Sequence, residues 1–139
     1  MASIQRFEEI EACQTGRALT RQIYQLTSKG DFSPDFTLKD HIKRACVSIT
    51  SNIAEGFERG GNREFVQFLA TAKGSASEVK SQLHTALAAG RITRKKFDEL
   101  DQQAHSVVSL LAGFIKYLQP SELRGRKFKP VASRNNPEP

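Results

Sequence analysis

Apolar residues recur at intervals of three and four along four stretches of this 139-residue chain, and no other feature restricts its fold as strongly. Such spacing keeps a stripe of side chains on one face of an α-helix. The stripes are Ala12, Gly16, Leu19, Ile23 and Leu26; Leu38, Ile42, Ala45 or Cys46, Ile49 and Ile53; Phe65, Phe68, Leu69, Ala72, Ala76, Val79, Leu83, Ala86 and Leu87; and Phe97, Leu100, Ala104, Val107, Val108, Leu111, Phe114, Ile115 and Leu118. We therefore expect four amphipathic helices.

Residues that begin or end helices separate these stripes. Glycines suited to helix C-termini follow the first three, at Gly30, Gly60-Gly61 and Gly90. The expected N-terminal caps of the last three helices are Thr37, Asn62 and Thr93. Residues 31–35 are expected to form a loop, and Pro120 to end the fourth helix. No segment alternates apolar and polar residues as a strand would.

These elements predict an all-α protein, an antiparallel up-and-down four-helix bundle over residues 1–119 with a flexible basic tail over residues 120–139. Half of the formal net charge of +6 lies in this tail. A segment rich in Pro, Gly, Ser and Asn with this charge can be an arm that contacts nucleic acid, or a tail that only adds solubility.

The sequence has no run of about 18 apolar residues, so we expect no membrane contact. Glu8, Glu9 and Glu11 lie where a secretory signal would need apolar residues. Cys13 and Cys46 lack the spacing of a zinc site and are expected to be buried, reduced thiols. Together these features predict a cytoplasmic protein.

The sequence contains no recognisable catalytic site. His41, His84 and His105 have no Glu three residues before them, as a di-iron bundle requires, and no zinc-protease motif is present. The sequence also has no nucleophile elbow or phosphate loop. His105 is expected to meet Asp101 only as a surface contact. We predict that the protein is not an enzyme and uses no cofactor or metal.

Basic residues gather in three places. The candidate phosphate contacts are Lys39, Lys43, Arg91, Arg94, Lys95, Lys96, Arg124, Arg126, Lys127 and Lys129. Positive charge at the start of the fourth helix opposes the helix dipole, which suggests a role in binding phosphate. The alternative is a solvated face without function.

A polar face is expected on the second helix, because Ser48, Asn52, Glu55 and Arg59 are separated by four, three and four residues. Arg44 extends this face and is expected to reach Glu78, while Glu55 lies near Arg59 or Arg63. These side chains can form a network between the second and third helices, or can contact a ligand or partner.

Gly74 and Gly113 lie inside the third and fourth helices. A glycine there costs about 1 kcal/mol relative to alanine. We expect another backbone to approach closely at both positions, from the next helix of the bundle or from a neighbouring subunit.

Several motifs together resemble a known family: Phe7-Glu8, Gln14, Arg44-Ala45, Ser48-Ile49, Asn52-Ile53-Ala54-Glu55-Gly56, Arg59, Glu64-Phe65, Phe68-Leu69, Ala72, Gly74-Ser75 and Glu78. From about residue 5 to residue 118, the chain resembles the four-helix-bundle proteins encoded in intervening sequences of bacterial 23S ribosomal RNA genes. Cys13 stands where the family pattern has Trp, and the segment after Pro120 lies outside the resemblance.

The resemblance implies an up-and-down bundle that assembles as a ring-shaped homopentamer. A similar bundle is the accessory protein of diversity-generating retroelements, which partners a reverse transcriptase and binds nucleic acid. The resemblance implies no catalytic residues. It adds Arg44, Ser48, Asn52, Glu55, Arg59, Glu64 and Glu78 as family-motif positions of the polar network.

Two functions follow. The first is a homo-oligomeric adaptor that binds RNA or DNA phosphates, with a nucleic-acid-processing protein as a further partner. The second is a protein-interaction module whose Asn52–Glu55 face meets a partner while the basic charge is incidental.

Overall fold

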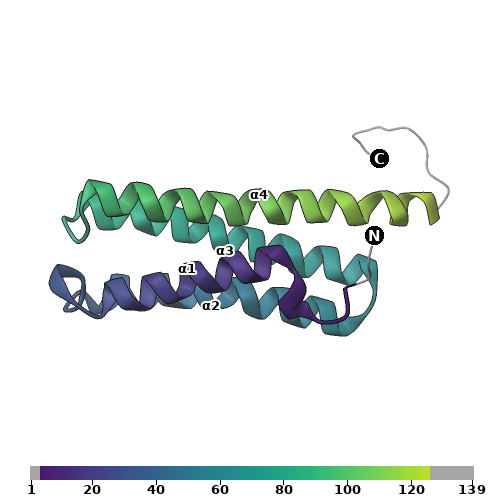
Figure 1. Cartoon of the computed structure of the whole chain (residues 1–139), viewed down its shortest axis with the longest axis horizontal. Coiled ribbons are helices and arrows are strands. Elements are labelled where there is room, and N and C mark those ends of the chain that lie inside the picture. The colour runs from purple at the N-terminus through teal and green to yellow at the C-terminus, as the bar shows by residue number, and fades with distance from the viewer. Residues whose placement is uncertain (1–3, 126–139) are drawn as a thin grey trace.

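Four α-helices run alternately up and down in the computed structural model, which describes residues 4–125 (Figure 1). They are α1 (Glu11–Thr27), α2 (Phe36–Arg59), α3 (Asn62–Ala88) and α4 (Arg94–Gly125), with single 3₁₀ turns η1 (Phe7–Glu9) and η2 (Gly30–Phe32). The predicted all-α antiparallel four-helix bundle is confirmed. Residues 4–125 contain no strand, and none of their helices has the length and hydropathy needed to span a membrane.

The predicted apolar stripes form the core between the helices. Each of the four stripes contributes fully buried side chains, among them Leu19, Ile49, Leu83 and Leu111. Four buried hydrophobic residues of the described chain lie outside the stripes: Ile10, Cys13, Phe32 and Ile92. Phe32 belongs to η2, so the predicted loop between α1 and α2 is a short helical turn with a core residue.

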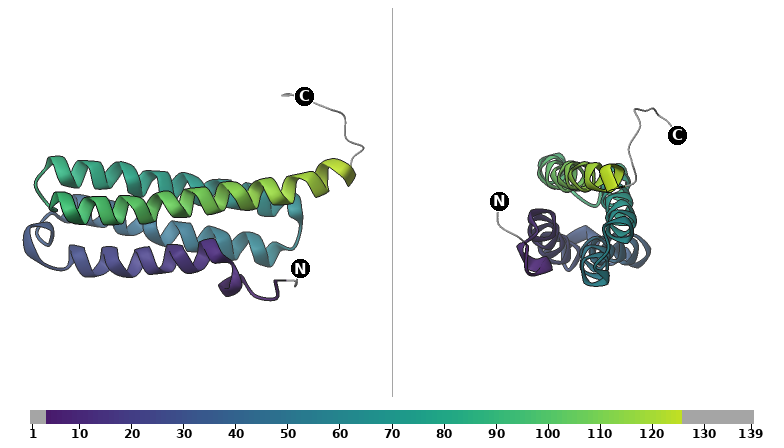
Figure 2. Two further views of the ribbon diagram at one scale, coloured as in Figure 1. Left: turned by 45° about the horizontal axis from the view of Figure 1, so that its top comes forward. Right: turned by 90° about the vertical axis from the view of Figure 1, so that its right-hand side faces the viewer.

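The first helix is the least tightly packed member of the bundle. It has 17 residues, whereas α4 has 32 and extends beyond the other helices at one end (Figure 2). Contacts between α2 and α3 and between α3 and α4 are far more extensive than those between α1 and α4. The seam between α1 and α4 is therefore where the bundle is most open.

Two predicted N-terminal caps are wrong. Asp35, not Thr37, caps α2, since its carboxylate accepts a hydrogen bond from the Leu38 N–H at 3.2 Å. Gly61, not Asn62, precedes α3, because Gly60 (φ 88°) reverses the chain and α3 begins immediately afterwards. Thr93 does cap α4, and its hydroxyl accepts from the Lys96 N–H at 3.1 Å.

The predicted end of α4 at Pro120 is also wrong, because the helix continues to Gly125. Proline lacks an N–H, and its ring crowds the carbonyl four residues earlier. That carbonyl belongs to Lys116, which is exposed, so water can satisfy it.

Neither Gly74 nor Gly113 packs against another helix of the bundle, so the expected close approach of the next helix at these two positions is wrong. A Cβ atom built on Gly74 or Gly113 would meet nothing within 4 Å. The close approach occurs at Gly56, where a Cβ would lie 2.6 Å from Phe68 Cβ, and to a smaller degree at Gly16. Gly56 thus lets α2 and α3 pack closely.

Candidate nucleic-acid interface

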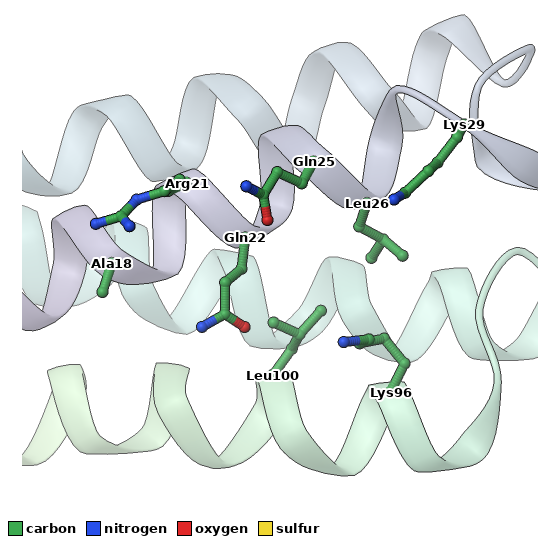
Figure 3. A pocket seen from close by; sticks show the side chains of 8 residues that line it. All are labelled: Ala18, Arg21, Gln22, Gln25, Leu26, Lys29, Lys96 and Leu100. Carbon is green, nitrogen blue, oxygen red and sulfur yellow. The ribbon is translucent and has the colours of Figure 1, made fainter.

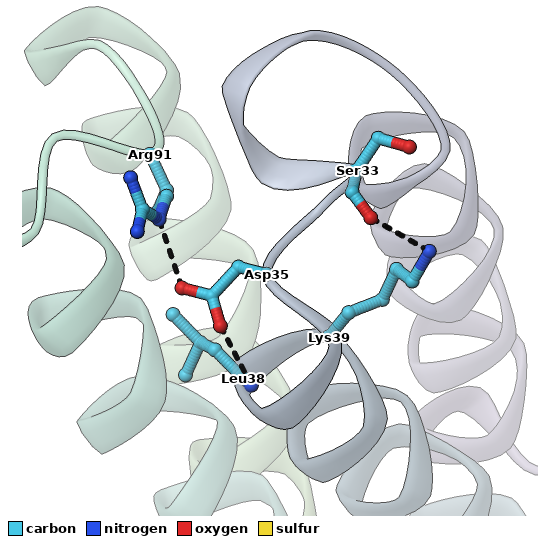
Figure 4. Close-up of polar contacts among 5 residues, drawn as sticks. All are labelled: Ser33, Asp35, Leu38, Lys39 and Arg91. Carbon is cyan, nitrogen blue, oxygen red and sulfur yellow. Dashed lines mark hydrogen bonds and ion pairs between the residues drawn. The ribbon is translucent and has the colours of Figure 1, made fainter.

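Lys39 and Lys43 lie on α2 without an acidic partner among the described residues. Lys39 Nζ donates to the Ser33 carbonyl at 2.9 Å (Figure 4). It also lies 5.0 Å from the centre of the Phe36 ring. Lys43 Nζ lies 4.5 Å from the centre of the Tyr24 ring on α1. Both predicted cations therefore lie next to aromatic rings, a pairing that was not predicted from the sequence.

The Arg91–Lys96 cluster carries less available charge than its sequence suggests. Arg91 Nε lies 2.8 Å from Asp35, Arg94 Nε lies 3.2 Å from Asp98, and Lys96 Nζ lies 3.2 Å from Glu99. Lys95 is the only one of the four predicted cations with no ion pair in the described part of the chain. The Arg94 and Lys96 pairs are exposed i,i+4 and i,i+3 contacts, so phosphate can compete for both cations.

Asp35 links the start of α2 to the loop before α4 (Figure 4). One carboxylate oxygen accepts from the Leu38 N–H, and the other from Arg91 Nε. The hydrogen bond from Arg91, followed by that from the Leu38 backbone, holds the pKa of Asp35 below its usual value. Arg91 thus has a structural role, which lowers its availability for a ligand.

A groove of about 440 Å³ lies along the seam between α1 and α4 (Figure 3). We call it the α1–α4 groove, and its lining residues are Ala18, Arg21, Gln22, Gln25, Leu26, Lys29, Lys96 and Leu100. Gln22 and Leu26 extend from α1 towards α4, and Leu100 extends from α4 towards α1. Three of the lining side chains are cations, and none is an acid.

Arg21 and Lys29 form no ion pair with any residue that the structure describes. Two cations without counter-ions, beside the amide donors of Gln22 and Gln25, form a site suited to phosphate. Arg21 and Lys29 were not among the predicted phosphate contacts. Their signal is the Arg21, Gln25, Lys29 spacing, which places one polar side chain per turn along the edge of the α1 stripe.

The remaining predicted contacts lie at the C-terminal end. Arg124 falls in the last turn of α4, whereas Arg126, Lys127 and Lys129 lie outside the described residues. Their role in phosphate binding stays a prediction.

The polar face of α2 does contact α3, though through fewer residues than expected. Ser48 Oγ lies 2.8 Å from Ser75 Oγ, and Asn52 Nδ2 donates to the Ser48 carbonyl and hydroxyl at 2.8 and 3.0 Å. Ser75 belongs to the Gly74-Ser75 family motif but was not predicted as part of the polar network, since its small hydroxyl falls within an otherwise apolar stripe. Asn52 is half-buried and bonds within its own helix to Ser48, whose hydroxyl makes the contact with Ser75 of α3.

The charged members of that face pair within α2. Arg44 pairs with Asp40 at 2.9 Å and not with Glu78, and Arg59 pairs with Glu55 at 3.0 Å. The expected link from Arg44 to Glu78 is therefore wrong, because Asp40 lies one turn away on the same helix. Glu64 and Glu78 are exposed on α3.

Two further expectations concern titratable groups. Asp101 pairs with Lys80 of α3 at 3.1 Å, so the expected contact with His105 is wrong.

Both cysteines are buried and free, as predicted. Burial raises the pKa of Cys46 to about 12, against a small opposing effect of a Thr20 hydrogen bond, and burial also raises the pKa of Cys13. Within residues 4–125, no group of His, Cys, Asp and Glu side chains is arranged to hold a metal ion.

Comparison with known proteins relates this bundle to others. Residues 8–113 match the model of a family described as 23S rRNA-intervening sequence protein. A solved structure from Bacteroides thetaiotaomicron, a protein of unknown function from the S23 ribosomal protein family, is similar with a TM-score of 0.70 and 21% identity. The similarity covers 76% of this chain and 95% of that one, and at this identity it shows the fold alone. No curated protein matches the chain.

Proposed function

Because the chain belongs to the 23S rRNA-intervening sequence protein family, we propose that it is a non-enzymatic, homo-oligomeric bundle that binds the phosphate backbone of RNA or DNA. The observation that carries the proposal is the α1–α4 groove, with three cations, two amides and no acid. Two of the three groove cations, Arg21 and Lys29, have no counter-ion among the described residues and need not lose a protein partner when a phosphate binds, whereas Lys96 is paired with Glu99.

Binding through such contacts recognises the backbone and not the base sequence. The groove supports this mode because Arg21, Gln25 and Lys29 are exposed long side chains placed one turn apart along α1 (Figure 3). Lys95 adds a cation at the start of α4, next to Lys96. A cytoplasmic location and a nucleic-acid-processing partner are part of the same proposal.

The test is a fluorescence anisotropy titration of the full chain with a labelled single-stranded RNA at low salt. The double variant Arg21→Gln/Lys29→Gln should bind about tenfold or more weakly, as expected for the loss of two phosphate contacts. The control Lys73→Gln/Lys116→Gln makes the same change in net charge away from the groove and should bind as the wild type does. Absence of binding by the wild type at low salt would reject the proposal.

Self-association is supported by a separate observation. Gly74 and Gly113 face open space on α3 and α4, and Tyr117 is 60% exposed. A helix surface without Cβ atoms lets a second backbone approach closely, which accounts for two glycines that the single chain does not need. The resemblance implies a pentamer, and the proposal here is the weaker one that copies associate.

Light scattering after size-exclusion chromatography tests this association. The wild type should have a mass of at least twice the 15.5 kDa of one chain. The variant Gly74→Lys/Gly113→Lys should have a lower mass, closer to that of one chain. A wild-type mass of one chain over the whole accessible concentration range would reject association.

The alternative, a protein-interaction module using the Asn52–Glu55 face, has less support. Asn52 is engaged within α2, and Glu55 pairs with Arg59. Capture of a partner protein that is lost in Glu55→Ala, with no change in RNA binding, would favour this alternative.

A further inference from the structure

Two exposed aromatic rings, one on α1 and one on α2, lie beside lysines of α2. We call the residues Phe36, Lys39, Lys43 and Val47 of α2, together with Tyr24 of α1, the aromatic stripe. The four α2 positions are three, four and four residues apart and therefore share one face of the helix. We propose that this stripe stacks unpaired bases, which makes the protein selective for single-stranded over double-stranded nucleic acid; the inference rests on the function proposed above.

The exposure of these rings separates them from the core. Phe36 is 73% exposed and Tyr24 43% exposed, whereas Phe32, only four residues before Phe36, is completely buried. The bundle therefore does not use the Phe36 ring for its own packing. Aromatic side chains that present a face to solvent are the groups on which nucleic-acid bases stack in proteins that bind single strands.

The lysines complete the recognition of a nucleotide. Lys39 Nζ lies 5.0 Å from the Phe36 ring centre, and Lys43 Nζ lies 4.5 Å from the Tyr24 ring centre. Each ring thus has an ammonium group over one of its two faces in a cation–π contact. A base stacked on the opposite face keeps its phosphate within reach of the same lysine, so one pair supplies both contacts.

Charge along the stripe is complementary to a phosphate backbone. None of its five residues is acidic, and the nearest acid along α2, Asp40, is paired with Arg44 at 2.9 Å. From Phe36 to Lys43 the helix rises roughly 10 Å. The two rings therefore take different bases of one strand.

The stripe is continuous with the α1–α4 groove through Arg21. This residue lines the groove, and it lies three residues before Tyr24, so the two side chains are neighbours on the surface of α1. A strand that crosses α1 can place phosphates at Arg21 and in the groove, and bases at Tyr24 and Phe36. A duplex cannot use the rings, because its bases are paired and stacked inside the helix.

The chain offers a direct optical test, since it contains two tyrosines and no tryptophan. The variant Tyr117→Phe leaves Tyr24 as the sole source of tyrosine fluorescence. A single-stranded RNA should quench this emission after correction for absorbance. An abasic strand of equal length, which carries the phosphates without bases, should bind without quenching it.

Affinity measurements provide the second readout. Tyr24→Leu and Phe36→Leu keep the net charge and alter exposed positions, and circular dichroism checks that they fold. Each should weaken binding of single-stranded RNA by about tenfold and leave binding of a duplex unchanged.

The outcomes separate the two proposals. If RNA and abasic strands bind equally without quenching, the aromatic stripe is not a base-binding surface, although phosphate binding stands. If neither strand binds the wild type at low salt, the function proposed above fails, and this inference with it.

Discussion

At the scale of single residues, several charged side chains make hydrogen bonds and ion pairs within the protein that sequence position alone does not reveal. Asp35 is the clearest case, since one carboxylate caps α2 and holds Arg91 from the loop before α4. The sequence indicates that a cap is needed near residue 36, but Thr37 and Asp35 both satisfy that local rule. The choice between them depends on Arg91, which is 56 residues away along the chain.

We predict that Asp35→Ala lowers the Tm more than Asp35→Asn does, because Asn retains a cap acceptor and loses only the ion pair. The pKa of Asp35 is lowered in the folded state from its ordinary value of 3.8, so its contribution is fully present at neutral pH and is lost as the pH falls from that value through the lowered pKa of the folded state. Thermal unfolding followed by circular dichroism should therefore show the wild type and Asp35→Asn converging as the pH falls through this acid range. A constant difference from neutral to acid pH would contradict this role.

Cys46 gives a prediction at the opposite end of the pH scale. Its pKa is about 12 in the fold and 9.0 in the reference state, so the folded chain favours the neutral thiol. The contribution of this raised pKa to the free energy of unfolding is fully present below about pH 9 and is lost as the pH rises towards 12. Relative to Cys46→Ala, the wild type should lose roughly 1.4 kcal/mol per pH unit in this range. Urea unfolding under reducing conditions measures this loss, and parallel pH profiles of the two proteins would contradict it.

At the scale of helices, the sequence predicts where the helices lie, but not which of their residues contact a neighbouring helix. Stripes at intervals of three and four identify all four helices, because the burial of one face dominates the energetics of an amphipathic helix. Whether a glycine faces a neighbour or solvent depends on how helices are rotated against each other. Gly56 and Gly74 both lie inside helices, yet only Gly56 contacts another helix.

This contrast predicts opposite effects of one substitution. Gly74→Ala and Gly113→Ala should each raise the free energy of unfolding by about 0.5–1 kcal/mol, since alanine favours the helix and meets no atom within the chain. Gly56→Ala should lower it by about 1–3 kcal/mol, because the new Cβ would lie 2.6 Å from Phe68 Cβ. Denaturant unfolding at a concentration where the chain is monomeric distinguishes them. A similar effect at all three positions would show that the helix packing described here is wrong.

At the scale of the whole molecule, the net charge of +6 is a poor guide to where an anion binds. The cluster most visible in the sequence, Arg91–Lys96, is largely paired with Asp35, Asp98 and Glu99. Asp98 and Glu99 could have been recognised from their helical spacing, but Asp35 could not. Arg21 and Lys29, which have no ion-pair partner within residues 4–125, become a site only because α1 and α4 pack loosely, which is a property of the assembled bundle.

The salt dependence of binding measures how the molecule distributes this charge. For a single strand, the slope of log K against log salt changes by about 0.7 for each phosphate contact, because each contact releases condensed counter-ions. Arg21→Gln/Lys29→Gln should therefore reduce the magnitude of the slope by about 1.4. The control Lys73→Gln/Lys116→Gln should leave it unchanged, although its net charge falls equally. If the groove variant keeps the full slope while deletion of residues 126–139 removes most of it, the phosphate contacts belong to the C-terminal segment and not to the groove.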